Sequence, residues 1–160
     1  MAYRDSLDEI DLKILDLLQR DGRITNADLA RLVGLSPPSV LQRVRKLEDA
    51  GVIVAYETRL DAEKLGFGLL IYVQIGLSLH HDRAITEFRR AVKAMPEVLE
   101  CQHVSGDFDF LLKVVAQDMR TYEKFVTEKI SIIRGVGKIH SFFTLGTTKD
   151  TNILPLEQVK

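Results

Sequence analysis

Residues 36–47 carry the side chains whose types and spacing point most clearly to a chemistry. Four polar residues spaced at i, i+3, i+4 and i+7 would line one face of a helix: Ser39, Gln42, Arg43 and Lys46. Arginine and lysine can bond guanine O6 and N7, glutamine can pair with adenine, and serine can bond a base or a phosphate. The pattern favours a helix that reads the major groove of DNA, against the alternative of an ordinary solvated face. Arg45 beside this face and Arg31 upstream could both reach phosphate.

A second candidate site is the segment VSGDFD at residues 104–109. A glycine at Gly106 would let backbone N–H groups approach a ligand closely, and Asp107 and Asp109 could accept from an ammonium group. Together these groups could hold both ends of a free amino acid. The alternative is an ordinary hairpin turn, for which Gly-Asp is common, and the residues by themselves favour that alternative.

No pattern predicts catalysis or metal binding. The adjacent His80 and His81 would point apart in regular structure, and His103 and His140 are expected on strands. Neither a phosphate loop of Walker type nor a Ser/His/Asp motif in a recognisable context occurs. We therefore expect no enzyme activity, no cofactor and no metal site.

Three short helices are expected to position the first candidate site. Apolar residues at helical spacing predict a helix from Leu7, with Ser6 and Glu9 spaced as a capping box and Asp21-Gly22 as its end. A second helix should begin after Thr25, which precedes Asp28 by three residues, and should end at Gly34.

Ser36 can cap the third helix, with Pro37 at its first position and Gly51 at its end. A tight turn containing glycine between the second and third helices predicts a helix-turn-helix. Val52 to Arg59 is β-prone and suggests a short wing or linker strand.

The hydrophobic period changes after residue 60, and the remaining chain predicts a mixed domain in the order β-α-β-β-α-β, the ferredoxin-like arrangement. The expected elements are the strand 69–79, the helix 82–95, the strands 98–104 and 108–116, the helix 119–133 and the strand 136–147. The fold class is therefore α+β, with a DNA-binding domain at residues 1–60 and a second αβ domain at 61–160.

The first strand of this second domain has apolar residues at both parities, as in Ile71 and Tyr72. Two helices cover only one face of a four-stranded sheet, so the other face should also be buried. A second copy of the chain is the simplest cover, and a dimer would present two recognition helices to an inverted-repeat operator.

Composition excludes several classes of protein. The chain has 160 residues, 46% of them hydrophobic, so it can bury a core and wholesale disorder is unexpected. Charged residues interrupt every long apolar run, which argues against a membrane-spanning helix, and the acidic N-terminus does not resemble a secretory signal. A single cysteine excludes an internal disulfide. The expected location is the cytoplasm.

The formal net charge of -1 argues at first against a nucleic-acid partner. However, Leu29 to Leu47 contains no acidic residue and carries four cations: Arg31, Arg43, Arg45 and Lys46. The acids of the first domain gather upstream, at Asp5 to Asp21. We therefore expect a local basic face with modest affinity per subunit, which an oligomer would multiply.

Two stretches resemble the Lrp/AsnC (feast/famine) family of transcriptional regulators: LDEIDLKILDLLQRDGRITNADLARLVGLSPPSVLQRVRKLEDAGVI and VSGDFDFLLKV. The resemblance spans nearly the whole chain. It implies an N-terminal winged helix-turn-helix and a C-terminal αβ-sandwich that dimerises and commonly assembles to octamers.

The resemblance also implies roles for individual residues. Those expected to face double-stranded DNA are Ser36, Ser39, Gln42, Arg43 and Lys46. Those expected at or near a pocket for a small effector, usually an amino acid, are Ser105, Gly106, Asp107, Phe108 and Asp109. Phe108 takes a place often held by tyrosine, so a hydrogen bond from a hydroxyl there is lost.

Two other functions stay open at this stage. Sirohaem decarboxylases are similar to the family in architecture, and His103 or His140 could serve such an enzyme, although it would not need the basic face. An architectural DNA-compacting protein would differ by weak sequence preference and long footprints.

Overall fold

The computed structural model describes residues 6–78 and 82–158, which divide into two compact units. The first unit holds residues 6–59 together with 149–158, and the second holds the described residues from 60 to 148. The C-terminal segment was expected in the second domain, but it packs with the first. Gln19 explains this placement, because its side-chain amide donates to the Leu154 carbonyl (3.0 Å) and accepts from the Leu154 N–H (2.8 Å).

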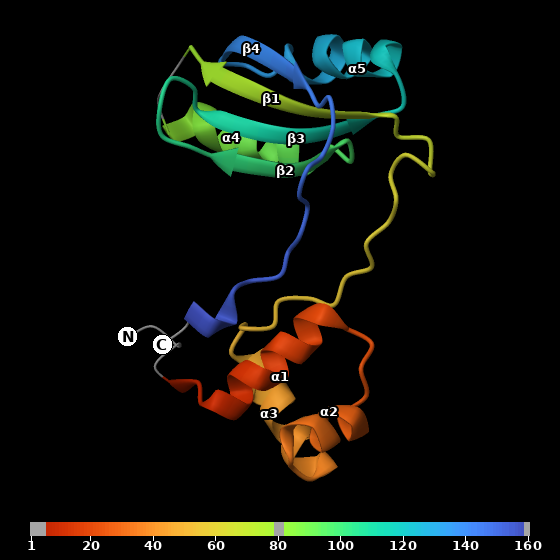
Figure 1. The fold of residues 1–160 in the computed structure, drawn as a ribbon. Coiled ribbons are helices and arrows are strands. Elements are labelled where there is room, and N and C mark those ends of the chain that lie inside the picture. Colours follow the sequence, from red (N-terminus) through yellow and green to blue (C-terminus); the bar gives the residue numbers. More distant parts are fainter. Residues whose placement is uncertain (1–5, 79–81, 159–160) are drawn as a thin grey trace. The chain divides into compact units, whose positions relative to one another are not determined.

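Three helices form the first unit: α1 (Glu9–Arg20), α2 (Asn26–Val33) and α3 (Pro37–Asp49) (Figure 1). Their apolar stripes meet in one core of fully buried side chains: Ile14, Leu29, Ala30, Val40, Val44 and Leu47. Each buried face has the helical spacing that the sequence predicted. The expected helix-turn-helix is confirmed.

The start of α1 differs from the prediction. Asp8, not Ser6, caps the helix, because its carboxylate accepts the Asp11 N–H at 2.8 Å and the Asp11 carboxylate accepts the Asp8 N–H at 3.3 Å. Aspartate caps a helix as well as serine does, so the local sequence offered two starts. The capping box of Asp8 and Asp11 is the one the fold uses.

The other helix boundaries follow the sequence. The Thr25 hydroxyl accepts the Asp28 N–H (3.1 Å) at the start of α2, and Gly34 ends that helix with φ 72°, a left-handed conformation that favours glycine. At the start of α3 the Ser36 hydroxyl accepts the Ser39 N–H (3.4 Å). Pro37 occupies the first position, where no N–H is needed.

The expected wing strand is absent from residues 52–59, which run without strand pairing. The N–H groups of Val52 and Ile53 both donate to the Leu47 carbonyl (2.9 and 3.2 Å), which closes the end of α3 instead of building a sheet. A β-prone segment forms a strand only beside a partner, and the sequence does not show whether one is present.

The second unit is a four-stranded antiparallel sheet with two helices (Figure 1). Along the chain its elements are β1 (Leu69–Leu77), α4 (Asp82–Lys93), β2 (Val98–His103), β3 (Phe110–Ala116), α5 (Met119–Phe125) and β4 (Val136–Phe143). The strand order β2-β3-β1-β4 confirms the ferredoxin-like topology. His80 and His81 lie outside the described residues.

One face of this sheet carries the core. Ile71, Val73 and Ile75 of β1 are completely buried against Phe88 of α4 and Phe125 of α5. On the opposite face Tyr72 pairs with Phe142 of β4, and these two side chains keep 38% and 50% of their surface exposed. The first strand is therefore apolar on both faces, as expected, and only one face is covered within the described chain.

The described residues of the second unit contain irregularities that the sequence did not predict. The register of β2 shifts between Val98 and Glu100, and Leu99 at this shift is 55% exposed. The second helix of this unit changes at Val126–Ile130 into a π-helical turn. That turn keeps both Phe125 and Ile130, five residues apart, in the core.

Among the described residues, no helix is long and apolar enough to cross a membrane.

Candidate functional site

The outer surface of α3 presents most of the residues expected to contact DNA. Ser36, Ser39, Gln42, Arg45 and Lys46 are all exposed. The hydroxyls of Ser36 and Ser39 lie 2.8 Å apart and share a hydrogen bond at the first turn of the helix. The N-terminal turn of α3 therefore offers hydroxyls, and its later turns offer an amide and two cations.

Arg43 does not belong to that exposed surface. Its Nη1 donates to Oδ2 of Asp8 and to Oδ1 of Asp11, both at 2.7 Å, and only 30% of its side chain is exposed. Arg43 is thus directed toward α1 and is less exposed than the other residues expected on this face, and its contact with DNA stays a prediction. The spacing on α3 did not reveal this contact, because the carboxylates that bond Arg43 come from α1, more than 30 residues away.

The same contacts set the charge state of this cluster. The Asp11 N–H and then the Arg43 guanidinium hold the pKa of Asp8 below its ordinary value. The two carboxylates raise the pKa of Arg43, which stays protonated. Asp11 is 4% exposed, so the partnership of Arg43 compensates a carboxylate removed from water.

The remaining cations between Leu29 and Leu47 differ in whether they form an ion pair. Arg31 pairs with Asp28 on the same helix at 3.0 Å, in an exposed contact that a phosphate could replace. Arg45 and Lys46 form no ion pair with any described residue. Of the four cations between Leu29 and Leu47, these two therefore carry the unneutralised charge.

Arg45 and Lys46 border a shallow groove along α3 that the sequence argument did not describe. Its walls are Pro38, Leu41, Gln42, Arg45, Lys46, Asp49 and Ala50. Leu41 is half-buried and lines the groove. The spacing of 38, 41, 42, 45, 46 and 49 is itself a helical face and could have revealed the groove.

The turn at residues 104–109 joins β2 to β3. Gly106 has φ 128°, which an L side chain rarely adopts, so a glycine is required there. Ser105, Gly106 and Asp107 are exposed, whereas Phe108 and Asp109 are half-buried. The structure thus brings the five expected effector residues together in one turn.

Asp109 is committed to holding this turn against β1. Its carboxylate accepts the Leu77 N–H at 2.6 Å, and its own N–H donates to the Ile75 carbonyl at 2.9 Å. Its carbonyl accepts the Val104 N–H at 3.0 Å. Of the two acids expected to receive an ammonium group, Asp107 is the exposed one, and Asp109 is tied to the fold.

The described residues contain no cluster of three or more histidine, cysteine or acidic side chains that could hold a metal ion. His103 accepts a hydrogen bond at Nδ1 from Arg89. Cys101 is a free thiol, and burial raises its pKa above the ordinary value.

Comparison with known protein families gives two matches that together span most of the chain. Residues 7–54 match a model described as winged helix-turn-helix DNA-binding, and residues 70–154 match the Lrp/AsnC ligand binding domain. The first match contains all of α1 to α3, and the second contains the turn at 104–109 and all of the sheet except Leu69, the first residue of β1.

Relatives named leucine-responsive regulatory protein match nearly end to end. The protein from Rhizobium meliloti is 42% identical over 150 residues, which cover 94% of this chain and 96% of that protein. The one from Escherichia coli strain K12 is 40% identical over 151 residues, covering 94% of this chain and 92% of that protein.

Solved structures of transcriptional regulators are similar to this chain over nearly its whole length. A transcriptional regulator from Neisseria meningitidis, crystallised as a complex with L-Met, superposes with a TM-score of 0.91 at 36% identity, covering 96% of this chain and 99% of that one. An AsnC family transcriptional regulator from Agrobacterium tumefaciens superposes with a TM-score of 0.88 at 36% identity, covering 94% of this chain and 98% of that one.

Proposed function

The chain belongs to the Lrp/AsnC family of transcriptional regulators, and on that premise we propose how it binds operator DNA and responds to an effector. Both domains of such a regulator are present: a helix-turn-helix that matches the winged helix-turn-helix family model, and a ligand-binding domain. The DNA-binding surface is the exposed side of α3, with Gln42, Arg45 and Lys46 at the base edges or phosphates. The observation that carries the proposal is that Arg45 and Lys46 on this helix form no ion pair with any residue that the structure describes.

Ser36 and Ser39 at the first turn of α3 add hydroxyl donors for phosphate or base, and Arg31 on α2 adds a phosphate contact. Arg43 acts here as a positioning residue. It orients α3 through Asp8 and Asp11 and does not itself read a base.

The effector is an amino acid held at the turn Ser105–Asp109. Exposed backbone N–H groups around Gly106 suit a carboxylate, and the exposed Asp107 suits an ammonium group. The L-Met complex of the Neisseria meningitidis regulator supports an amino acid as the ligand class. An effector of this kind acts by binding one conformation or assembly more tightly than another.

A homodimer is the proposed unit, with the open sheet faces of two copies packed together and octamers as a further assembly. Tyr72 and Phe142 on that face are large and partly exposed, which a partner would relieve. A dimer presents two α3 helices, and its operator would be an inverted repeat. The protein has no catalytic role in this proposal, and its expected compartment is the cytoplasm.

A titration of DNA binding tests the proposal. The full-length protein should retard a duplex of its own upstream region far better than a shuffled duplex of equal length. When single amino acids are added, some of them should change the protein concentration at the midpoint of the DNA titration. Asp107→Ala should abolish that change. Equal retardation of both duplexes would instead indicate architectural binding, and an identical midpoint with every amino acid would remove the effector assignment.

A further inference from the structure

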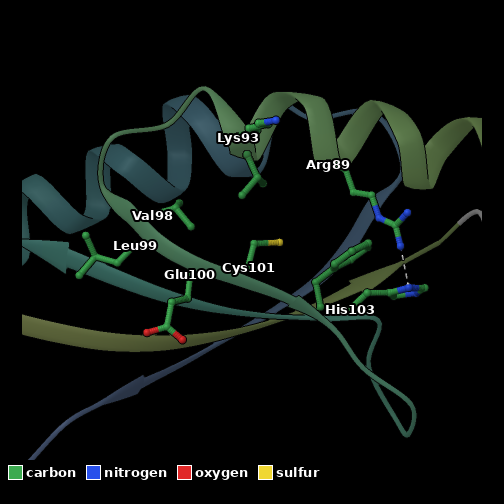
Figure 2. A pocket seen from close by; sticks show the side chains of 9 residues that line it. Arg89, Lys93, Val98, Leu99, Glu100, Cys101 and His103 are labelled. Carbon is green, nitrogen blue, oxygen red and sulfur yellow. Dashed lines mark hydrogen bonds between the residues drawn. The ribbon is translucent and has the colours of Figure 1, made fainter. Parts of the chain in front are cut away.

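A pocket of about 510 Å³ lies between α4 and the edge strand β2, separate from the five turn residues proposed for the effector (Figure 2). Its walls are Arg89, Val92, Lys93, Val98, Leu99, Glu100, Cys101, His103 and Phe110. This volume lies within the range of small-molecule sites. The pocket has two chemically different parts, because cations line one wall and apolar side chains line much of the rest.

The cationic wall comes from α4. Arg89 and Lys93 are four residues apart and so lie one above the other on the same side of the helix. Arg89 is held in place, because its Nη2 donates to Nδ1 of His103 at 2.9 Å and its Cζ lies 5.9 Å from the centre of the Phe110 ring. A guanidinium has five N–H donors, and this contact uses one of them.

Lys93 has no partner among the described residues, so its charge is unopposed. Glu100 is the only acid among the described residues of the wall, and its carboxylate accepts from Lys113 at 2.9 Å. Figure 2 shows Glu100 directed away from α4, whereas Cys101 points into the space below the helix. The pocket therefore has two cations to receive an anion and no carboxylate aimed at an ammonium group.

The apolar part of the wall is formed by Val92, Val98 and the ring of Phe110, the first and last of which are almost fully buried. A ligand that matches both parts carries one negative charge and an apolar body. A free amino acid matches less well, because its ammonium group would lie near Arg89 and Lys93 without an acidic partner.

We propose that this pocket binds a small organic carboxylate with an apolar tail and no ammonium group, a class for which 4-methyl-2-oxopentanoate serves as the probe. Arg89 and Lys93 receive the carboxylate, and Val92, Val98 and Phe110 pack against the tail. His103 donates from Nε2, since its Nδ1 accepts from Arg89.

The pocket also touches the base of the effector turn. His103 ends β2, Phe110 begins β3, and their rings stack at 4.7 Å on either side of residues 104–109. A carboxylate that accepts from the remaining N–H donors of Arg89 contacts the same guanidinium that bonds His103. Occupancy of the pocket is therefore coupled to the stacked pair on which the turn rests.

Cys101 supplies a reporter specific to this pocket, because it is the only cysteine in the chain and lies in the wall. The experiment measures the rate at which neutral iodoacetamide alkylates full-length protein. With 4-methyl-2-oxopentanoate the rate should fall at least fivefold, whereas L-leucine, which has the same carbon skeleton with an ammonium group, should change it less than twofold. Inorganic phosphate, which has charge but no tail, should also leave the rate within twofold.

Substitutions on α4 test whether Arg89 and Lys93 bind the carboxylate. Arg89→Ala and Lys93→Ala should each raise the half-protecting concentration about tenfold or more, as expected for a lost hydrogen bond to a charged group. Arg90→Ala, on the same helix but outside the pocket wall, should leave it unchanged. Thermal melting identifies any variant that fails to fold, and Arg89→Gln then replaces Arg89→Ala.

Three results would overturn the proposal: no protection by the oxo acid, equal protection by leucine, or protection that survives both substitutions on α4. This proposal does not depend on the proposed function. Alkylation of Cys101 is measured without DNA, and Asp107→Ala should leave the protection by the oxo acid unchanged.

Discussion

Arg43 of α3 donates a 2.7 Å hydrogen bond to Oδ1 of Asp11 on α1, and this carboxylate is almost fully buried. A second 2.7 Å bond from the same Nη1 reaches Asp8, the residue that caps α1. One cation thus fixes the orientation of α3 against the beginning of α1. The number of cations in the sequence of α3 is therefore larger than the number that is available to contact DNA, because Arg43 is paired with Asp8 and Asp11.

Arg43→Ala should lower the free energy of unfolding by about 1–3 kcal/mol, because Asp11 would remain buried without its cation. Urea denaturation followed by circular dichroism measures the change. Arg45→Ala, which removes an exposed cation two residues away, should stay within about 0.5 kcal/mol of the unchanged protein. If the two substitutions cost the same, Arg43 would not be a structural anchor.

The helices, the strand order and the turn at residues 104–109 followed from the sequence because each rests on local signals. Apolar spacing gave α1 to α3, Thr25 and Ser36 gave two helix starts, and glycines gave the turns. The ferredoxin-like order follows from the alternation of strands and helices, since few topologies join them with short connections.

The features that the sequence could not reveal all depend on a distant partner. Arg43 is turned inward by carboxylates of another helix, and Asp109 is tied to the backbone of Leu77, 32 residues away. Residues 52–59 have strand propensity, but their first N–H groups close α3 instead. The pocket beside Cys101 exists only because α4 crosses the edge strand β2.

Lys46→Ala and Arg45→Ala should each weaken operator binding and reduce the slope of log K against log salt by about 0.9 for each lost phosphate contact. A cation that bonds a base instead should weaken specific binding with a smaller change of slope. Filter binding or fluorescence anisotropy at several salt concentrations measures both. Lys124→Ala, an exposed lysine on α5, serves as the control and should change neither quantity.

The capping box should make the first unit sensitive to acid. The Asp11 N–H, and next the Arg43 guanidinium, lower the pKa of Asp8 below its ordinary 3.8. The ionised carboxylate therefore stabilises the fold above pH 3.8, and this contribution is lost as the pH falls through the lower folded pKa.

Thermal melting at a series of pH values from about 5 downward through 3.8 measures the effect. Asp8→Asn keeps a side chain that can cap the helix but cannot titrate. The melting temperature of this variant should fall less steeply with acid than that of the unchanged protein. Parallel curves would exclude a contribution from Asp8.

The Tyr56 hydroxyl should lose its proton at a higher pH than an ordinary tyrosine does. Burial, and next the hydrogen bond of its hydroxyl to Glu48 (2.9 Å), raise the pKa of Tyr56 to about 12 from an ordinary 10.0. The neutral phenol thus stabilises the fold fully below pH 10.0, and this contribution is lost as the pH rises through about 12. Ultraviolet absorbance of tyrosinate measures the titration. Tyr56→Phe should remove one late transition, and Glu48→Gln should move it to lower pH.

The two acids of the turn should separate stability from effector response. Asp109→Ala removes the acceptor of the Leu77 N–H, and it should lower the free energy of unfolding by about 1–3 kcal/mol. Asp107→Ala changes an exposed side chain, so stability should stay within about 0.5 kcal/mol while the effect of the amino acid on DNA binding is lost. Urea denaturation and the DNA titration, performed on both variants, distinguish the two roles. An Asp107→Ala protein that still responds fully would mean that the ammonium group is received elsewhere, and Asp109, despite its structural bonds, would then be the acid to test by substitution with asparagine.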